Sequence, residues 1–307
     1  MLAQICTAGF SVESYMVDFR NKLRLSLLLG IQQATAFRHA EHIFDQYDNP
    51  AAQGCFWVVG QSWTSILRMP KIKEHIQVET WIRSVSRVTS RRNFRVTDAH
   101  GHVVALTSMD WVVVDPATRR MQRLNEWNID RGLLRDVQAS PLEGRRLRSI
   151  PALTPVYLKT VYYSDIDENN HANNTRYVDW ILDSFNLDFL RQKEISHIYL
   201  SFKRECTLGN RLMILKGAYP LDTGGNMCPE RDVSCGKSSH NVDGTCFLGV
   251  DDRETYQEAG RQAYYVEGRF DDSLIESPYK SLHGSLHGSQ EQAFQAEILF
   301  RDCHSSS

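Results

Sequence analysis

Residues 156–192 read VYLKTVYYSDIDENNHANNTRYVDWILDSFNLDFLRQ, and three patterns follow one another within this stretch. Residues 156–164 are rich in Val and Tyr, which is typical of a β-strand. A segment crowded with Asn, Asp and one His comes next, and residues 175–192 then carry apolar side chains at three- and four-residue spacings. Such spacing predicts a helix with one apolar face. That face is formed by Tyr177, Val178, Ile181, Leu182, Phe185 and Phe189.

The same order of patterns occurs earlier in the chain. Residues 10–20 alternate roughly between apolar and polar side chains, which predicts a strand, and residues 25–43 carry a helical apolar stripe. Runs rich in Val, Ile, Thr and Trp follow each of the two predicted helices, as expected of antiparallel strands. These runs span residues 56–69, 75–88, 91–115, 196–206, 212–219, 263–270 and 293–301.

This repeat predicts an α+β fold made of two similar units. A long helix cannot bury its apolar stripe alone, and a curved antiparallel sheet can wrap it. We expect one unit over residues 1–127, a linker rich in Pro and Arg over residues 128–154, and a second unit over residues 155–307. The two units can pair edge to edge and extend a single sheet. Residues 221–261 follow neither period and are expected to be a flexible insertion.

Composition restricts the partners of the chain. Its 307 residues carry a formal net charge of −2, which gives no overall field toward nucleic acid or anionic lipid. No apolar run approaches the roughly 18 residues of a membrane span. The first residues lack the pattern of a secretory leader, and an odd number of cysteines, seven, fits free thiols in a reducing compartment. We therefore expect a cytoplasmic protein.

The polar segment before the second predicted helix allows two interpretations. Asn and Asp are common helix caps, because their short side chains bond to nearby backbone amides. However, a histidine side chain can donate or accept a proton near neutral pH, and capping does not require one. His171 lies among Asp167, Asn169 and the start of a helix, whose unpaired amides we expect to favour developing negative charge. We interpret this cluster as a candidate catalytic site.

A second candidate motif is SFKREC, residues 201–206. On a regular strand Glu205 and Cys206 would point to opposite faces. Cys206 shares its parity with apolar positions, so we expect its thiol to pack in the core and Glu205 to face the other side.

These motifs together resemble the acyl-acyl-carrier-protein thioesterases of plants and bacteria. The segment DIDENNHANNTRYVDWILD and the strand motif FKREC are similar to that family's catalytic motifs, and TSRRNFRVTDAHGHVVALTSMDWVVVDPATRRMQRL is similar to its N-terminal sheet. The resemblance implies two tandem hotdog domains and hydrolysis of fatty acyl-carrier-protein thioesters, with release of free fatty acid and without a cofactor or metal. It implies the catalytic set Asp167, Asn169, His171 and Glu205, with Cys206, Asn173 and Asn174 as accessory candidates.

The resemblance also indicates where substrate would bind. The family holds the acyl chain mainly in its first domain, where the candidates here are Leu28, Gln32, Ala36, Trp57, Trp63 and Trp81. Carrier protein is acidic, so a docking surface should be basic. The candidates for it are Arg87, Arg91, Arg92, Arg119, Arg120 and Arg123.

Several alternatives remain open from the sequence. An acyl-CoA thioesterase, a hotdog dehydratase and a noncatalytic acyl-binding module would share much of this pattern. Zinc binding by Cys228, Cys235, His240 and Cys246 is disfavoured, because six residues separate the first two cysteines where structural sites have two to four. The chain could act as a monomer, in which the two units mimic a dimer, or as a homodimer.

Overall fold

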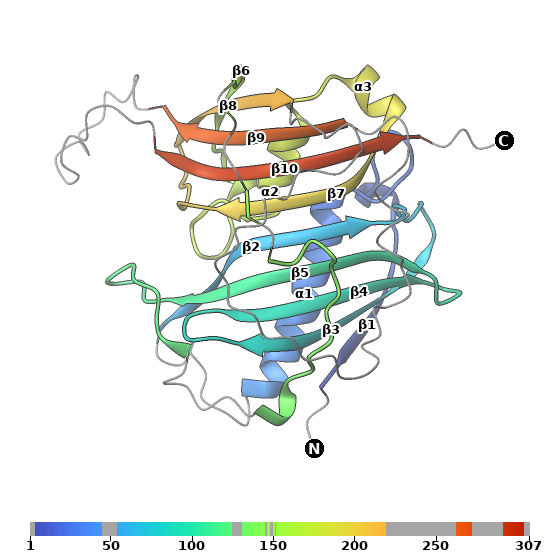
Figure 1. Cartoon of the computed structure of the whole chain (residues 1–307), viewed down its shortest axis with the longest axis vertical. Helices are drawn as coiled ribbons and strands as arrows, with labels where there is room; N and C mark the ends of the chain where they lie inside the picture. Colours follow the sequence, from blue (N-terminus) through green and yellow to red (C-terminus); the bar gives the residue numbers. More distant parts are fainter. Residues whose placement is uncertain are drawn as a thin grey trace, which may run out of the picture.

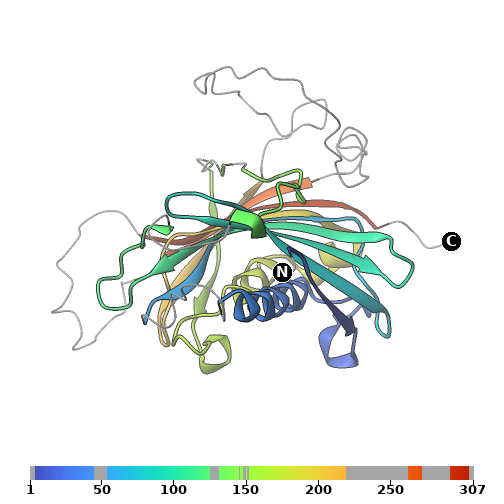
Figure 2. The same ribbon diagram turned by 90° about the horizontal axis from the view of Figure 1, so that it is seen from below.

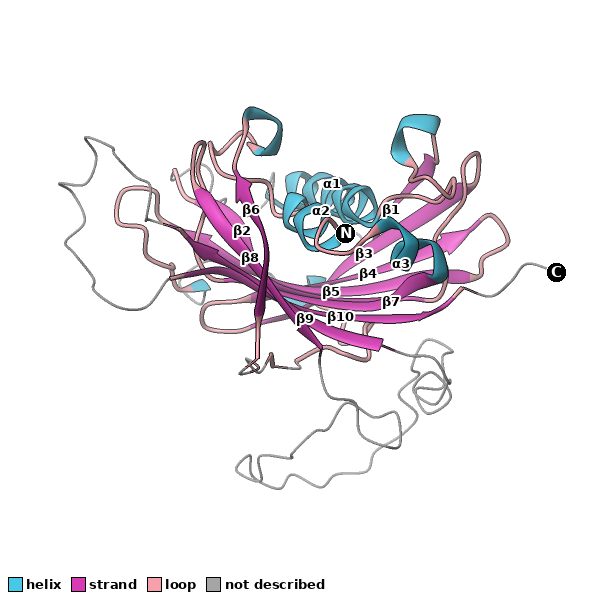
Figure 3. Cartoon of the chain, turned by 90° about the horizontal axis from the view of Figure 1, so that it is seen from above, coloured by secondary structure: helices cyan, strands magenta, loops and turns pink. Residues whose placement is uncertain are grey.

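The computed structural model describes residues 4–44, 54–124, 131–144, 146–147, 150, 152–218, 262–271 and 291–303. In these ranges ten strands form one antiparallel sheet that arches over the helices (Figures 1 and 2). Figure 3 shows the helices gathered on the concave side of this sheet. None of the described helices is both long enough and apolar enough to cross a membrane.

The two halves contain the same series of elements. The first half consists of β1 (Cys6–Ser11), the 3-10 turn η1 (Ser14–Met16), α1 (Leu25–Phe44), β2 (Phe56–Ile66), β3 (His75–Val85), β4 (Ser90–Asp98) and β5 (Val103–Val114). The second consists of β6 (Thr154–Thr160), η5 (Tyr163–Asp165), α2 (Arg176–Leu182), α3 (Leu187–Gln192), β7 (Lys193–Phe202), β8 (Arg211–Ala218), β9 (Gln262–Phe270) and β10 (Gln292–Asp302). A short turn, η4 (Arg131–Leu133), lies between them.

The order of strands confirms the internal repeat. Across the sheet it is β1-β3-β4-β5-β2-β7-β10-β9-β8-β6, so each half has the same arrangement read from its outer edge inward. The halves meet where β2 pairs antiparallel with β7, from Gln61 opposite Ser201 to Ser65 opposite His197. The expected edge-to-edge pairing of the two units is therefore present.

Several predicted elements have different bounds in the structure; the strands predicted over 75–88 and 156–164, for example, end at Val85 and Thr160. The first strand ends at Ser11, because the chain turns through η1 instead of continuing to residue 20. The strand predicted over 196–206 ends at Phe202. The helix predicted over 175–192 is divided into α2 and α3, since Asn186 accepts a hydrogen bond from the Phe189 N–H at 2.7 Å and caps a new helix.

The main core lies between the helices and the concave face of the sheet. Leu28, Val78 and Phe94 are fully buried there. The convex face is also covered, by the segment after η4, which crosses β4 and β5 in Figure 1. Trp81 packs beneath this segment with Leu106 and Ala139, and its Nε1 donates to the Val137 carbonyl at 3.0 Å.

The loop before α2 is fixed by a buried carboxylate, Asp165. Its Oδ2 lies 2.8 Å from the Lys159 ammonium and accepts the Tyr162 N–H, while its Oδ1 accepts the Trp180 indole N–H at 3.2 Å. Burial opposes ionisation of Asp165, but the hydrogen bonds from Lys159 and the Tyr162 amide outweigh it and lower the pKa of this carboxyl. The carboxylate therefore stabilises the folded state when it is charged.

We expect Asp165→Asn to reduce the free energy of unfolding at pH 7 by roughly 1–3 kcal/mol, because the partly buried ammonium of Lys159 loses its counter-ion. A lowered folded-state pKa gives stability that is present above the unfolded pKa, about 3.9, and is lost as pH falls through the folded value. Urea denaturation at pH 7 and pH 3 should thus show a difference that shrinks in acid. An equal loss at both values would contradict this role.

Candidate active site

The loop that carries His171 is a tight hairpin between η5 and α2. Ile166 and Ala172 form an antiparallel bridge, and the Asp167 N–H donates to the His171 carbonyl at 2.8 Å. Asn170 adopts a positive φ of 60°, a conformation that Asn tolerates better than most residues. The Ala172 N–H donates to the Cys206 carbonyl at 2.7 Å and so ties this hairpin to the segment that follows β7.

This connection brings His171 and Glu205 into contact. His171 Nε2 lies 3.2 Å from Glu205 Oε2. The imidazole is largely enclosed, with 13% of the His171 side chain exposed against 36% for Glu205. Its ring also stacks against Phe56 at the start of β2, with centroids 6.4 Å apart. The pair is therefore held at the junction of the two halves with one side open to solvent.

Arg119, from the first half of the chain, also contacts His171 and Glu205. Its Nη1 lies 2.7 Å from Glu205 Oε2 and 3.4 Å from His171 Nε2. Arg119 follows β5 in a turn that Asp115 organises, since Asp115 Oδ1 accepts the amides of Ala117 and Thr118. Arg119 itself has a φ of 56°, an unfavourable conformation for this residue type. The turn thus holds a strained residue that reaches across to the second half.

Asp167 and Asn169 belong to the same loop as His171. Asp167 Oδ1 accepts the Asn169 N–H at 2.9 Å. In the described part of the chain neither side chain hydrogen-bonds to His171 or Glu205. The structure therefore joins two of the four predicted catalytic side chains directly and links Asp167 to His171 through the backbone.

The accessory asparagines have structural partners. Asn173 Oδ1 accepts the Thr175 N–H at 3.0 Å and the Thr175 hydroxyl at 2.7 Å. Asn174 exchanges two hydrogen bonds with Gln33 of α1, at 2.9 and 3.1 Å, and so joins the loop to the first half.

The start of α2 differs from the expectation of free amides. The amides of Thr175, Arg176 and Val178 all donate to nearby acceptors. These three amides are thus already hydrogen-bonded, so the expected contribution of this helix start to binding an oxyanion is not supported.

Cys206 packs inside the protein, as its sequence parity suggested, although it lies beyond the end of β7. It is fully buried in the main core. Burial raises the pKa of its thiol to about 11, against a smaller opposite effect of hydrogen bonding with Tyr177. The thiol is therefore neutral at physiological pH and shielded from solvent, which argues against a nucleophilic role.

We expect Cys206→Ala to keep at least half of the turnover of the unmodified protein and to cost about 1 kcal/mol of stability through lost packing. Steady-state kinetics and thermal unfolding measure the two effects separately. Loss of turnover in a folded Cys206→Ala protein would instead indicate a chemical role for the thiol.

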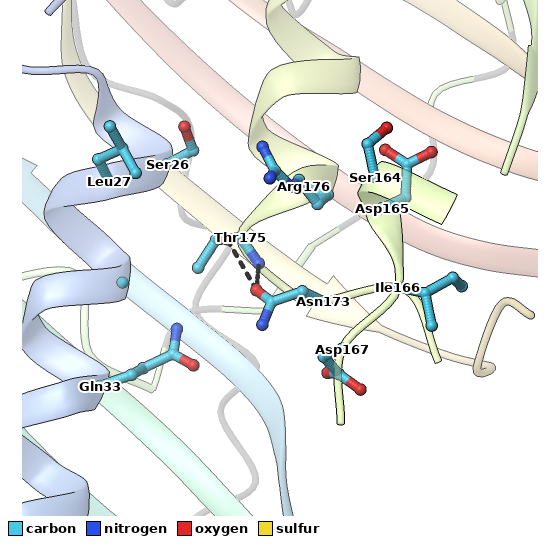
Figure 4. A pocket seen from close by; sticks show the side chains of 11 residues that line it. Ser26, Leu27, Gln33, Ser164, Asp165, Ile166, Asp167, Asn173, Thr175 and Arg176 are labelled. Atoms are coloured by element: carbon cyan, nitrogen blue, oxygen red, sulfur yellow. Dashed lines mark hydrogen bonds between the residues drawn. The ribbon is translucent and has the colours of Figure 1, made fainter. Parts of the chain in front are cut away.

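A pocket of about 310 Å³ opens beside the catalytic loop (Figure 4). One wall is α1, with Ser26, Leu27, Gly30 and Gln33. The other wall belongs to the second half and includes Asp167, Asn173 and Thr175. The pocket therefore lies between the two halves, on the side of α1 that faces the loop.

The acyl-chain candidates separate into two groups. Leu28, Gln32 and Ala36 are buried on α1, and Gln32 Nε2 donates to Thr107 Oγ1 of β5 at 3.1 Å. Trp57 lies on β2. Trp63 and Trp81 were wrong candidates, because they lie on the convex face, where Trp81 packs under Ala139 and Trp63 packs with Leu142 and Tyr199. Alternation along a strand identifies two buried faces but not which one meets the helix.

The six arginines predicted to bind carrier protein differ in their partners and in their exposure to solvent. Arg91 makes a bidentate pair with Asp110, at 2.6 and 2.8 Å, and a further contact with Glu143 on the convex face. Arg92 is buried against His39 and Thr80, and burial lowers its pKa to about 10. Neither guanidinium is available for docking, so these two predictions were wrong. Arg119 lies in the site, while the remaining candidates, Arg87, Arg120 and Arg123, are exposed.

Metal binding gains no support in the described residues, where no group of His, Cys, Asp and Glu could hold an ion. The disfavoured zinc candidates, Cys228, Cys235, His240 and Cys246, and the whole 221–261 insertion lie outside those residues.

Comparison with known proteins identifies the family. Residues 4–130 match the acyl-ACP thioesterase N-terminal domain, and residues 157–244 match the acyl-ACP thioesterase C-terminal domain. The chain belongs to the acyl-ACP thioesterase family. The boundary between the two matches falls near the predicted linker, and the division into 1–127, 128–154 and 155–307 stays a prediction.

Relatives of this thioesterase family member include two proteins of Arabidopsis thaliana. A chloroplastic palmitoyl-acyl carrier protein thioesterase is 26% identical over 74% of this chain and 58% of its own length. The chloroplastic oleoyl-acyl carrier protein thioesterase 2 is 27% identical over 64% of this chain and 58% of its own length. The chain thus spans a little over half the length of the curated relatives it matches.

Solved structures agree with the fold. An acyl-ACP thioesterase from Bacteroides thetaiotaomicron superposes with a TM-score of 0.67, at 21% identity over 97% of this chain and 98% of that one. The 12:0-ACP thioesterase from Umbellularia californica gives a TM-score of 0.69, at 18% identity over 99% of this chain and 96% of that one. The α+β hotdog fold predicted for the chain is confirmed.

Proposed function

We propose that this protein hydrolyses the thioester of fatty acyl-acyl carrier protein and releases free fatty acid and holo-carrier protein. The observation that carries the proposal is the contact between His171 Nε2 and Glu205 Oε2 at 3.2 Å, beside a pocket at the junction of the two halves. A histidine and a carboxylate within hydrogen-bond reach can move a proton, which is what activation of water requires.

In the proposed reaction, Glu205 accepts a proton from a water molecule while the water oxygen bonds to the thioester carbonyl carbon. Asn169 helps to position that water. His171 polarises the carbonyl oxygen, which becomes an oxyanion in the tetrahedral intermediate. The carbonyl then re-forms, the carbon–sulfur bond breaks, and the thiolate leaves with the electron pair. A thiol pKa of about 8.5 allows it to leave without a strong acid and to regain a proton afterwards.

Asp167 has two possible roles in this scheme. It orients the loop, since its amide bonds the His171 carbonyl and its carboxylate bonds Asn169. Alternatively, its carboxylate acts directly on the carbonyl carbon.

Arg119 is a positioning residue in this proposal. Its guanidinium bonds the Glu205 oxygen that faces His171, so it fixes the position of that carboxylate. Because Arg119 comes from the first half and Glu205 from the second, the site requires both halves to be joined. Arg119 therefore acts in the site in this proposal, and not in carrier docking as its sequence position suggested.

Substrate binding in this proposal uses the remaining candidates. The acyl chain extends along Leu28, Gln32, Ala36 and Trp57 in the first half. Acidic carrier protein docks near the exposed Arg87, Arg120 and Arg123. One chain suffices for the site, and a homodimer would leave this chemistry unchanged.

A thiol-release assay tests the function. Acyl-carrier proteins of several chain lengths and the matching acyl-CoA esters are incubated with the protein, and free thiol and free acid are measured. Preferential cleavage of carrier-bound chains supports the proposal, whereas equal or better cleavage of acyl-CoA favours a coenzyme A thioesterase. A dehydratase would release water without thiol, and a binding module would retain the intact thioester.

A further inference from the structure

The first half of the chain contains a counterpart of the catalytic loop. A bridge between Val17 and Leu23 closes it, just as a bridge between Ile166 and Ala172 closes the catalytic loop. The turns that precede the two loops, η1 in blue and η5 in yellow-green, lie on opposite sides of the helices in Figure 2. The residues of the two loops therefore correspond one to one, and we call the segment from Val17 to Leu23 the counterpart loop.

The backbone has the same conformation in both loops. The Asp18 N–H donates to the Lys22 carbonyl at 2.8 Å, and the Asp167 N–H donates to the His171 carbonyl at the same distance. The residue before Lys22 and the residue before His171 are both asparagines with a positive φ, of 57° and 60°. Each loop is thus the same tight turn, which starts at an aspartate.

The aspartate at the start of each turn uses its carboxylate in the same way. Asp18 Oδ1 accepts the Arg20 N–H at 2.8 Å, and Asp167 Oδ1 accepts the Asn169 N–H at 2.9 Å. A side-chain oxygen that accepts the amide two residues further on forms an Asx turn, which stabilises this backbone conformation. In both loops the carboxylate therefore helps to fix the turn.

The segments to which the two loops are anchored also correspond. The Leu23 N–H donates to the Pro70 carbonyl, and the Ala172 N–H donates to the Cys206 carbonyl, both at 2.7 Å. Pro70 lies beyond the end of β2, as Cys206 lies beyond the end of β7. The residue before each of these two acceptors is therefore equivalent across the repeat.

The counterpart loop lacks both members of the proposed catalytic pair. Met69 takes the place of Glu205, and Lys22 takes the place of His171. A thioether is only a weak hydrogen-bond acceptor, and the ammonium of Lys22 is paired with Glu194. Neither position offers a general base, yet this loop keeps its aspartate.

The Asp18 carboxylate has a structural task in the counterpart loop. Its Oδ2 accepts Nε and Nη2 of Arg20 at 3.3 and 3.2 Å. Nη1 of Arg20 in turn donates to the carbonyls of Leu190 and Lys193 in the second half, at 2.9 and 3.0 Å. The aspartate of this loop thus orients the residue two positions further on, without any part in hydrolysis.

We propose that the Asp167 carboxylate positions Asn169 and His171 and forms no bond to the substrate. Attack by this carboxylate would instead expel the thiolate and form a mixed anhydride with the acyl group, which water would then cleave. The counterpart loop contains the same carboxylate with the same hydrogen bond in the absence of such chemistry. This inference rests on the proposed thioesterase function and decides between the two roles of Asp167.

Asp167→Asn and Asp167→Ala distinguish positioning from attack. The Asn side chain keeps an Oδ1 that can accept the Asn169 N–H, but it is not a carboxylate nucleophile. With acyl-pantetheine, we expect Asp167→Asn to keep kcat within about threefold and Asp167→Ala to lower it at least about tenfold, with KM nearly unchanged in both. The dependence of kcat on pH should keep its shape in Asp167→Asn. Intact-mass measurement checks that the introduced amide has not deamidated to Asp.

Asp18→Ala is the matched control, because Asp18 starts the same turn in the loop that lacks the catalytic pair. It should keep kcat within about twofold, since the proposed site lies in the other loop. Both alanine variants should lower the midpoint of thermal unfolding by about 2 °C or more, because each loses the hydrogen bond that fixes its turn.

The remaining outcomes separate this proposal from the proposed function. A folded Asp167→Asn protein as slow as Asp167→Ala would overturn the positioning role and assign a chemical one to the carboxylate. Full activity of Asp167→Ala, or an equal fall in kcat for Asp18→Ala, would overturn it as well. If the unmodified protein released no thiol from acyl-pantetheine or acyl-carrier protein, hydrolysis itself would fail. Should Asp167→Ala unfold, Asp167→Ser supplies a weaker acceptor, and its kcat must lie below that of Asp167→Asn.

Discussion

Glu205→Gln is expected to lower kcat for thiol release by at least about 100-fold, with KM nearly unchanged. The amide has the shape of the carboxylate and can still bond Arg119 and His171, but it cannot accept a proton from water. Glu205→Ala should abolish turnover for the same reason. Stability should change little, since both members of the ion pair between Glu205 and Arg119 are partly exposed to solvent.

A matched control for this variant is Glu291→Gln. Glu291 is also a solvent-exposed carboxylate paired with an arginine, Arg204, and it lies outside the proposed site. Steady-state kinetics with acyl-carrier protein, together with thermal unfolding, should show normal turnover for Glu291→Gln. A folded Glu205→Gln protein with full activity would remove this carboxylate from the mechanism.

Arg119→Ala is expected to lower kcat at least about tenfold, because Glu205 loses the group that holds its reactive oxygen. Arg119→Lys should recover part of this loss, since an ammonium restores the charge without the planar fork. Acyl-pantetheine is the substrate of choice, as it removes any contribution from carrier docking.

The control for Arg119 is its neighbour Arg120, which is exposed. Arg120→Ala should leave kcat for acyl-pantetheine unchanged and, if Arg120 belongs to a docking surface, raise KM for acyl-carrier protein only. An equal fall in kcat for both alanine variants, or no recovery with lysine, would argue against a positioning role for Arg119.

Much of the fold could be predicted from periodicity. The series of strand, helix and strands occurs twice because each helix needs a sheet to bury its stripe, and the pairing of β2 with β7 follows from that symmetry. The break between α2 and α3 could not be predicted in this way. Phe185 and Phe189 continue the apolar stripe and stack with centroids 5.2 Å apart, so only the capping bond of Asn186 marks the new helix.

Fewer residues of the candidate site than of the fold could be predicted from the sequence. The motifs around His171 and Glu205 indicated these two residues through their resemblance to a family, and the structure brings them together. Arg119 was assigned to docking, because 86 residues separate it from Glu205 and their contact depends on how the halves join. The TRR motif after β5 was the available signal.

The most direct test of the account is a double-mutant cycle on kcat for thiol release, using His171→Ala, Glu205→Gln and the combined variant. If the two side chains act as one unit, the combined variant should be no slower than the slower single variant. Effects that multiply, or turnover that survives both substitutions, would contradict the proposal that this pair is the hydrolytic centre.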